Sequence, residues 1–198
     1  MSLFVKICGL RDAATVRAAV EAGASAVGFV FAASKREVSV EQARAAAAGA
    51  PASVLRVAVM RHPAPETWEA VRDGFAPDVL QTDAEDFAGL DVPAGIERWP
   101  VYREGGEPVP SEPTGTFIYE GPSSGAGEPG NWEQAAALSE NRQMILAGGL
   151  DAENVARDVT TVRPWGVDVS SGVESAPGEK DVDRIREFIS AARAAEKQ

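Results

Sequence analysis

Eight short apolar runs recur along the chain, and stretches with helical spacing separate most of them. The runs are Leu3–Ile7, Ala26–Phe31, Val54–Met60, Asp78–Gln81, Ile96–Tyr102, Thr116–Tyr119, Gln143–Ala147 and Gly166–Val169. Most of them are continuous in Val, Ile, Leu and Phe rather than alternating, which is typical of strands that are buried on both faces. Buried strands that alternate with helices indicate a parallel α/β fold.

Five of the intervening stretches place apolar side chains at helical intervals, with polar side chains between them. They cover residues 12–21, 40–48, 66–74, 151–162 and 181–195. Asp12 and Ser39 are expected to cap the first two helices, because their side chains accept hydrogen bonds from free backbone amides. Gly23 is expected to end the first helix.

Eight strand–helix units predict a single (β/α)8 barrel domain over residues 1–198. Such barrels begin at ~200 residues, so a chain of 198 residues has almost no room for insertions. Residues 104–115 contain three prolines and three glycines, so we expect a loop in place of the fifth outer helix. Residues 121–130 are rich in Gly, Ser and Pro, and we expect an active-site loop there. An open doubly wound sheet fits the same alternation, but residues 8–13 lack its Gly-x-Gly-x-x-Gly phosphate loop.

The charge and the rare residues exclude several classes of function. With 30 acidic and 19 basic residues the formal net charge is −11, which argues against nucleic-acid and membrane partners. Cys8 is the single cysteine, so an intramolecular disulfide and a thiolate-rich zinc site are both excluded. The single histidine, His62, excludes mechanisms that need two imidazoles. No secretory leader and no apolar stretch of ~20 residues is visible, so we expect a cytoplasmic protein.

Several reactive side chains fall where a barrel carries its chemistry, at the carboxyl ends of the strands. Cys8 follows the first strand and is either a general base or nucleophile, or a buried apolar filler. A thiol base needs a lowered pKa, and Lys6, on the same side of the strand by alternation, is the expected cause. Glu120 ends the sixth strand as a candidate general acid or a solvated carboxylate. His62, in a loop before a proline, is expected to be structural or exposed.

Two loops of small residues follow the seventh and eighth strands. They read Gly148-Gly149-Leu150-Asp151 and Asp168-Val169-Ser170-Ser171-Gly172. Barrels build phosphate sites at this place from backbone amides and a short helix N-terminus, without requiring a lysine. The glycines also suit ordinary turns and caps, but the occurrence of both loops in consecutive units favours a phosphate site.

Arg36 lies just after the second strand. A guanidinium at this position offers a bidentate contact to a substrate carboxylate. Spacing alone favours a solvated arginine paired with Glu37, so both interpretations stay open.

Longer motifs extend these observations over the whole chain. They are Val5-Lys6-Ile7-Cys8-Gly9-Leu10, Gly28-Phe29-Val30-Phe31, Ser34–Ser39, Leu146–Leu150, Gly166–Ser175 and Pro177–Asp181. In combination they resemble the phosphoribosylanthranilate isomerase family. The resemblance implies a (β/α)8 barrel that catalyses an Amadori rearrangement in tryptophan biosynthesis, from N-(5-phosphoribosyl)anthranilate to 1-(2-carboxyphenylamino)-1-deoxyribulose 5-phosphate. It implies a small phosphorylated substrate, no cofactor and no metal, and we expect a monomer or a homodimer.

The resemblance also assigns roles to individual residues. Cys8 matches the general base, and Arg36 matches the arginine that binds the anthranilate carboxylate. The family's general acid is an aspartate at the end of the sixth strand, where this chain carries Glu120, which is one methylene longer. The positions that match the family's phosphate ligands are Gly148, Gly149, Asp168, Ser170, Ser171 and Gly172.

The departures from the family pattern gather on the fourth to sixth strands. Gln81-Thr82-Asp83-Ala84 stands where the family has Gln-Leu-His-Gly, and residues 124–127 depart from its Gly-Gly-Thr-Gly loop. Two alternatives therefore stay open beside the isomerase. One is a phosphosugar enzyme of another class on the same barrel, such as a Schiff-base aldolase using Lys6. The other is a non-catalytic protein that binds a phosphorylated ligand.

Overall fold

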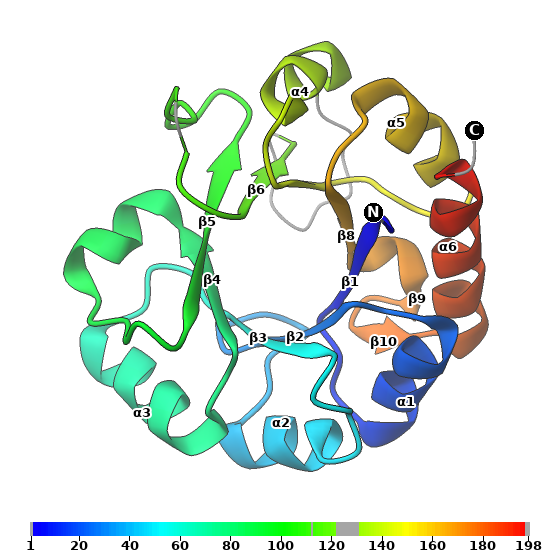
Figure 1. Ribbon diagram of the computed structural model, residues 1–198. Coiled ribbons are helices and arrows are strands. Elements are labelled where there is room, and N and C mark those ends of the chain that lie inside the picture. The colour runs from blue at the N-terminus through cyan, green and yellow to red at the C-terminus, as the bar shows by residue number, and fades with distance from the viewer. Residues whose placement is uncertain (1, 112, 122–130, 197–198) are drawn as a thin grey trace.

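The computed structural model describes residues 2–111, 113–121 and 131–196. Eight parallel strands form a closed barrel in chain order, with β8 paired to β1 (Figure 1). They are β1 Phe4–Cys8, β2 Ala26–Val30, β3 Leu55–Val59, β4 Val79–Asp83, β5 Glu97–Arg103, β6 Phe117–Glu120, β7 Met144–Ala147 and β8 Gly166–Val169. All eight predicted runs are strands, and the predicted barrel is confirmed over the open sheet.

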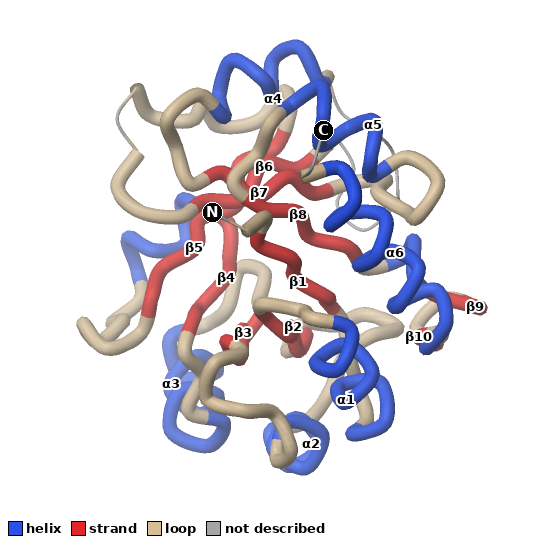
Figure 2. The backbone as a smooth tube through the Cα atoms, turned by 45° about the vertical axis from the view of Figure 1, so that its right-hand side comes forward, coloured by secondary structure: helices blue, strands red, loops and turns tan. Residues whose placement is uncertain are grey.

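Helices surround the barrel on its outside (Figure 2). Those in the described residues are α1 Ala13–Ala22, α2 Val40–Ala47, α3 Pro65–Phe75, α4 Trp132–Ser139, α5 Val155–Val162 and α6 Val182–Ala195. Asp12 and Ser39 cap α1 and α2 as predicted, and Gly23 follows the end of α1. No helix in the described part of the chain is long and apolar enough to cross a membrane.

Three helical segments differ from the expectation. The stretch expected to be helical from Asp151 becomes helix only at Val155, because Asp151 Oδ1 accepts hydrogen bonds from the amides of Glu153 and Asn154 and holds a turn. Helix α4 has no counterpart among the predicted helices. Between β4 and β5 the chain forms only the short 3-10 helix η1 Ala84–Gly89.

The fifth outer helix is missing, as predicted. Between β5 and β6, residues 104–111 and 113–116 form turns, bends and irregular backbone without a helix. The predicted active-site loop at 121–130 lies outside the described residues, apart from Gly121. After β8 the chain forms η2 Ser171–Val173 and a hairpin of β9 Glu174–Ala176 and β10 Glu179–Lys180.

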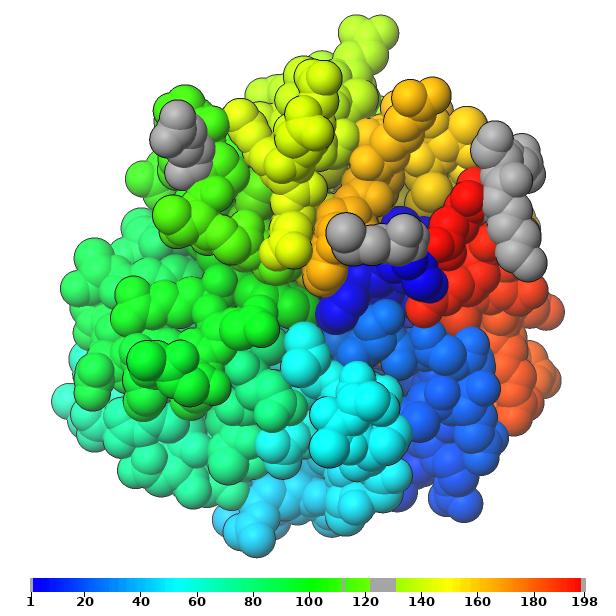
Figure 3. Space-filling model, in the orientation of Figure 1, coloured from blue at the N-terminus to red at the C-terminus, as the bar shows by residue number. Residues whose placement is uncertain are grey.

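The inward face of the barrel is packed with side chains, and the centre of the space-filling view is filled by atoms (Figure 3). Val57, Val101 and Ile118 belong to this inner cluster. Phe4 stacks on Trp165 with ring centroids 4.6 Å apart. Because side chains alternate along each strand, the same inward face continues to the carboxyl ends of the strands. There it carries Lys6, Cys8, Gln81, Asp83, Arg103, Glu120 and Asp168.

Candidate active site

The deepest part of the candidate site is a buried ion pair between neighbouring strands. Lys6 on β1 is opposite Asp168 on β8 in the strand register, and Lys6 Nζ lies 2.9 Å from Asp168 Oδ2. Asp168 Oδ1 is buried and has no hydrogen-bond partner among the described residues. Burial acts to lower the pKa of Lys6, but the attraction of Asp168 and Cys8 outweighs it and raises that pKa. Lys6 is therefore a charged ammonium group.

Cys8 ends β1 on the same inward face as Lys6, and it is buried. A Cβ atom added at Gly28 would lie 3.2 Å from Cys8 Sγ and 3.1 Å from Lys6 Cε, so both side chains line one space beside β2. The predicted lowering of the Cys8 pKa is wrong. Burial raises the pKa of the Cys8 thiol, and the attraction of Lys6 offsets this only in part because Asp168 shares that ammonium group.

Arg36 is held by Glu174 and not by Glu37. Glu174 accepts hydrogen bonds from Arg36 Nε at 2.6 Å and Nη2 at 3.0 Å. It also accepts bonds from Lys180 Nζ at 2.7 Å and from the Gly178 amide at 3.1 Å. Burial acts to raise the pKa of Glu174, but the hydrogen bonds from Arg36 and Lys180 outweigh it and lower that pKa to about 2.

This pairing fixes the direction of the guanidinium. A Cβ atom added at Gly9 would lie 2.8 Å from Arg36 Cδ, so the stem of Arg36 crosses the residue that follows Cys8. Glu174 occupies the edge formed by Nε and Nη2, whereas Nη1 makes no hydrogen bond to a described residue. Arg36 thus keeps a donor for a second carboxylate, with little rotamer freedom to lose on binding.

The Glu174→Gln variant is expected to lower the free energy of unfolding by about 3 kcal/mol at neutral pH, because it leaves a buried cation without its carboxylate. Lys180 is only 3% exposed. The effect is present above pH 4.5 and declines as the pH falls toward 2, since the fold lowers the Glu174 pKa from 4.5 to about 2. Urea unfolding of the parent protein and the variant across this range measures it. A loss below about 0.5 kcal/mol at neutral pH would contradict the prediction.

The loops after β7 and β8 pack against each other. A Cβ atom added at Gly172 would lie 2.0 Å from the Leu150 carbonyl oxygen and 3.0 Å from Asp151 Cα, so only glycine fits there. Gly148 and Gly149 have φ values of 94° and 66°, which a side chain would strain. The two predicted phosphate loops therefore meet at one place on the mouth of the barrel.

Lys180 supports the second of these loops. Its Nζ donates hydrogen bonds to the Ser170 carbonyl oxygen at 2.8 Å and to Ser170 Oγ at 3.1 Å. Ser170 Oγ also contacts the Cys8 carbonyl oxygen at 3.2 Å, which links the loop to β1. Asp168, predicted as a phosphate ligand, is paired with Lys6. Lys180 and Glu174 lie in a motif that the sequence displays, but neither residue was predicted to belong to the site.

Glu120 lies at the end of β6, beside the last residue of β5. The register places Arg103 directly opposite Glu120, and Arg103 Nε lies 3.2 Å from Glu120 Oε2. Arg103 also donates a hydrogen bond of 2.5 Å from Nη1 to Asp83 Oδ1 at the end of β4. Arg103 directly follows a predicted strand. Cys8 and Glu120 were selected because they lie at the carboxyl ends of strands, and the same criterion would have selected Arg103.

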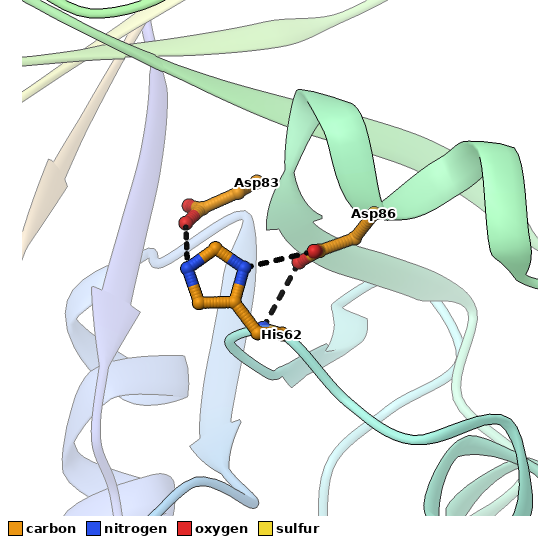
Figure 4. Close-up of side chains that lie close together, drawn as sticks. All are labelled: His62, Asp83 and Asp86. Carbon is orange, nitrogen blue, oxygen red and sulfur yellow. Dashed lines mark hydrogen bonds and ion pairs between the residues drawn. The ribbon is translucent and has the colours of Figure 1, made fainter.

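His62 lies between two carboxylates (Figure 4). Its Nδ1 is 2.9 Å from Asp86 Oδ1, and its Nε2 is 3.3 Å from Asp83 Oδ2. The hydrogen bond to Asp86 raises the pKa of His62. The three side chains offer ligand atoms within 4.8 Å of one another. The guanidinium of Arg103 already supplies a cation to Asp83, and the His62 ring lies within contact of both carboxylates, so these groups account for the cluster without a metal ion.

The His62→Gln variant is expected to destabilise the protein by less than about 1 kcal/mol, because the side chain is 55% exposed. The fold raises the His62 pKa above 6.5, so the stabilisation is complete below that value and is lost as the pH rises through the raised pKa. Urea unfolding of both proteins in acidic and alkaline buffers measures the difference. A difference that grows with pH would show that the ring does not stabilise the fold as a cation.

A closed parallel barrel with Cys8, Glu120, Arg36 and two glycine-containing loops at one mouth has the architecture of the (β/α)8-barrel class, whose enzymes carry their active sites at this end. Residues 113–191 match the family model described as N-(5'phosphoribosyl)anthranilate (PRA) isomerase. The N-(5'-phosphoribosyl)anthranilate isomerase of Listeria welshimeri is 37% identical, covering 98% of this chain and 100% of its own. The chain belongs to the N-(5'-phosphoribosyl)anthranilate isomerase family, which confirms the predicted resemblance.

Solved structures agree with this assignment. The phosphoribosyl anthranilate isomerase from Thermus thermophilus has a TM-score of 0.83 and 29% identity, covering 99% of this chain and 100% of its own. A phosphoribosyl anthranilate isomerase in complex with reduced 1-(O-carboxyphenylamino)-1-deoxyribulose 5-phosphate has a TM-score of 0.77 and 29% identity. The match covers 97% of this chain and 99% of that one. The barrel and its order of elements are therefore those of this family.

Proposed function

We propose that this chain converts N-(5-phosphoribosyl)anthranilate to 1-(2-carboxyphenylamino)-1-deoxyribulose 5-phosphate, with Cys8 as general base and Glu120 as general acid. The observation that carries the proposal is that both side chains belong to the inward face at the strand ends, on β1 and β6. Strands β7 and β8 separate them in the closed barrel, so a sugar between them meets an acid and a base on different sides. The rearrangement moves protons without a net redox change, and such a pair supplies what it needs.

The proposed mechanism begins at the ribose ring. Glu120 donates its proton to the ring oxygen while the bond between that oxygen and C1 breaks, and the nitrogen lone pair forms a C1=N Schiff base. The Cys8 thiolate then takes the proton from C2. The electrons of that C–H bond form the C1=C2 double bond of an enolamine, while the electrons of the C1=N double bond return to nitrogen as a lone pair. Protonation at C1 and loss of the proton from the C2 hydroxyl give the ketone.

Burial raises the pKa of Cys8, which limits the fraction of thiolate available for the second step. A thiolate formed from a thiol of high pKa is a minor species at neutral pH, but it is correspondingly more basic. Cys8 lies near two cations, Lys6 and Lys180, which both favour its ionised form. These two ammonium groups support the assignment of Cys8 as base, although burial opposes its ionisation.

The substrate's two anionic groups have complementary partners in the mouth. We infer that its phosphate binds the amides of the loops at Gly148–Gly149 and Ser170–Gly172, where the packed loops and Lys180 provide positive potential. We infer that its carboxylate binds Arg36 through the Nη1 edge. The relative solved with a reduced product analogue supports a mouth that accepts a ligand with both groups.

Among the alternatives, the Schiff-base aldolase is disfavoured by the state of Lys6. A lysine attacks a carbonyl only as a neutral amine. Lys6 is fully buried, is paired with Asp168 and has a raised pKa. The other alternative, a non-catalytic binder of phosphorylated ligands, differs from the isomerase in activity rather than in geometry.

Complementation of a tryptophan auxotroph that lacks this isomerase separates these two functions. The parent chain is expected to restore growth without tryptophan, and the Cys8→Ala variant, expressed to the same level, is expected not to. Growth with neither chain, despite soluble expression of both, would favour the non-catalytic binder. A monomeric or homodimeric state and a cytoplasmic location stay predictions, and light scattering of the purified chain decides the first.

A further inference from the structure

The carboxyl ends of β4, β5 and β6 carry three charged residues in contact. Asp83, Arg103 and Glu120 are the last residues of these three strands. Asp83 is opposite Val101 in the register, and Arg103, two residues further along the same face, is opposite Glu120. Parallel pairing and the alternation of side chains therefore place all three on the inward face.

Arg103 contacts the two carboxylates with unequal geometry. Its Nη1 donates a hydrogen bond of 2.5 Å to Asp83 Oδ1. Its Nε lies 3.2 Å from Glu120 Oε2 but makes no aligned hydrogen bond to a described residue. Asp83 is 3% exposed, so water competes little for this contact. The guanidinium thus bonds strongly to Asp83 and loosely to Glu120.

Other charged groups lie around Asp83, Arg103 and Glu120. Asp83 Oδ2 faces His62 Nε2 at 3.3 Å and Arg61 Nε at 3.9 Å, and His62 in turn contacts Asp86. On the other side of Glu120, β7 (Met144–Ala147) has no titratable side chain. The remaining ionisable groups on the inward strand ends are Cys8, Lys6 and Asp168.

We propose that Arg103 and Asp83 are positioning residues for Glu120, with Arg103 directing its carboxyl group and Asp83 holding Arg103 back from a full ion pair. The inference rests on the proposed function, in which Glu120 delivers a proton. A glutamate has one more rotatable bond than the family's aspartate, so it needs an additional contact to hold it. A cation alone would lower the pKa of Glu120, which would leave the side chain ionised and without a proton to donate. A second carboxylate that shares the cation keeps the contact and weakens this effect.

The two positioning residues therefore have opposite effects on the same group. When Asp83 loses its charge, the Arg103 guanidinium has only Glu120 as a carboxylate partner. This lowers the Glu120 pKa and reduces the fraction of the protonated acid. Removing the cation of Arg103 has the reverse effect on that pKa, although the carboxyl group loses its anchor. A purely structural role would predict no such opposition.

The test measures the titration of the Glu120 carboxyl carbon by NMR in the full chain labelled with ¹³C at glutamate, with the signal assigned by its absence in Glu120→Gln. Relative to the parent, the midpoint is expected to fall by about 1 pH unit in Asp83→Asn and to rise by about 1 pH unit in Arg103→Met. The kcat of both variants is expected to fall by about tenfold or more, because a displaced acid loses at least that much. Arg103→Lys, which keeps the cation, is expected to leave the midpoint closer to the parent value than Arg103→Met does.

Asp78→Asn is the matched control, because Asp78 pairs with Arg56 near the start of β3, at the opposite end of the barrel. It is expected to leave both the midpoint and kcat unchanged. Midpoints that stay fixed, or that move in the same direction in Asp83→Asn and Arg103→Met, would overturn the positioning role while Glu120→Gln is still inactive. If Glu120→Gln itself keeps the parent kcat, the proposed general acid is wrong and the positioning role is overturned with it.

Discussion

The Cys8→Ala variant is expected to lose about 10²- to 10⁴-fold in kcat, which is the contribution that a positioned general base makes. The affinity for a reduced product analogue is expected to stay within about threefold of the parent value, since the phosphate and carboxylate sites do not use the sulfur atom. Steady-state kinetics and calorimetric titration of the two purified proteins measure both quantities. The split between lost turnover and retained binding is the signature of a chemical role.

Cys8→Ser separates the chemistry of the side chain from its packing. Serine has nearly the same shape, but its hydroxyl does not ionise in the accessible pH range, so we expect the same loss of kcat as in Cys8→Ala. Because Cys8 is the single cysteine, thiolate absorbance reports its ionisation directly. Its midpoint is expected to lie above the ordinary cysteine value. Parent-like turnover in either variant would show that another group takes the C2 proton.

The Glu120→Gln variant is expected to lose about 10²- to 10⁴-fold in kcat, because the amide keeps the size of the side chain but has no acidic proton to give. Arg103 loses an opposite charge at 3.2 Å in this variant, but Asp83 still holds the guanidinium. The fold is therefore expected to persist, which circular dichroism checks. Single-turnover experiments are expected to show that ring opening, not product release, has become slow.

The Glu120→Asp variant examines the length of this side chain. The barrel places Arg103 to meet a glutamate, so a carboxyl group drawn back by one methylene is expected to recover only part of the lost activity. A displacement of about 1 Å at a reacting group costs on the order of 10²-fold. Unchanged kcat in Glu120→Gln would transfer the acid role to another group, of which Asp83 is the nearest candidate on the inward face.

The barrel could be predicted from the sequence because its strands are buried on both faces. Runs such as Ala26–Phe31 are apolar throughout, and few folds bury eight such runs separated by helices. Local signals also predicted the caps at Asp12 and Ser39 and the lost helix before β6. The reduction of the fourth helix to η1 was missed, because a 3-10 helix and a short α-helix have similar composition.

The position of Cys8 and Glu120 could be predicted, but their electrostatic surroundings could not. Lys6 was expected to lower the Cys8 pKa because the two side chains share one face of β1. Lys6 does act to lower that pKa, but the expectation omitted burial, which raises it more. It also omitted Asp168, which pairs with Lys6 although the two residues are 162 positions apart. The pairing of Arg36 with Glu174, 138 positions away, was missed for the same reason. Sequence neighbours suggest ion-pair partners, but the actual partners are residues from distant parts of the chain that closure of the barrel brings together.

Because the net charge is −11, binding of an anionic substrate depends on cations that lie close to the site. An anionic substrate is repelled by the chain as a whole, so its binding site must be built from groups that are close at hand. The structure adds Lys180 to the amides and the arginine expected from the sequence, and it buries that lysine between Glu174 and Ser170. The buried lysine is screened less by salt than an exposed one would be.

Turnover of N-(5-phosphoribosyl)anthranilate by the purified parent chain, beside Cys8→Ala and Glu120→Gln at the same concentration, tests the proposed function most directly. The parent is expected to show saturable conversion to 1-(2-carboxyphenylamino)-1-deoxyribulose 5-phosphate, and each variant is expected to lose most turnover while still binding the product analogue. Conversion by the parent no faster than the uncatalysed rearrangement, despite binding of that analogue, would contradict the proposed function.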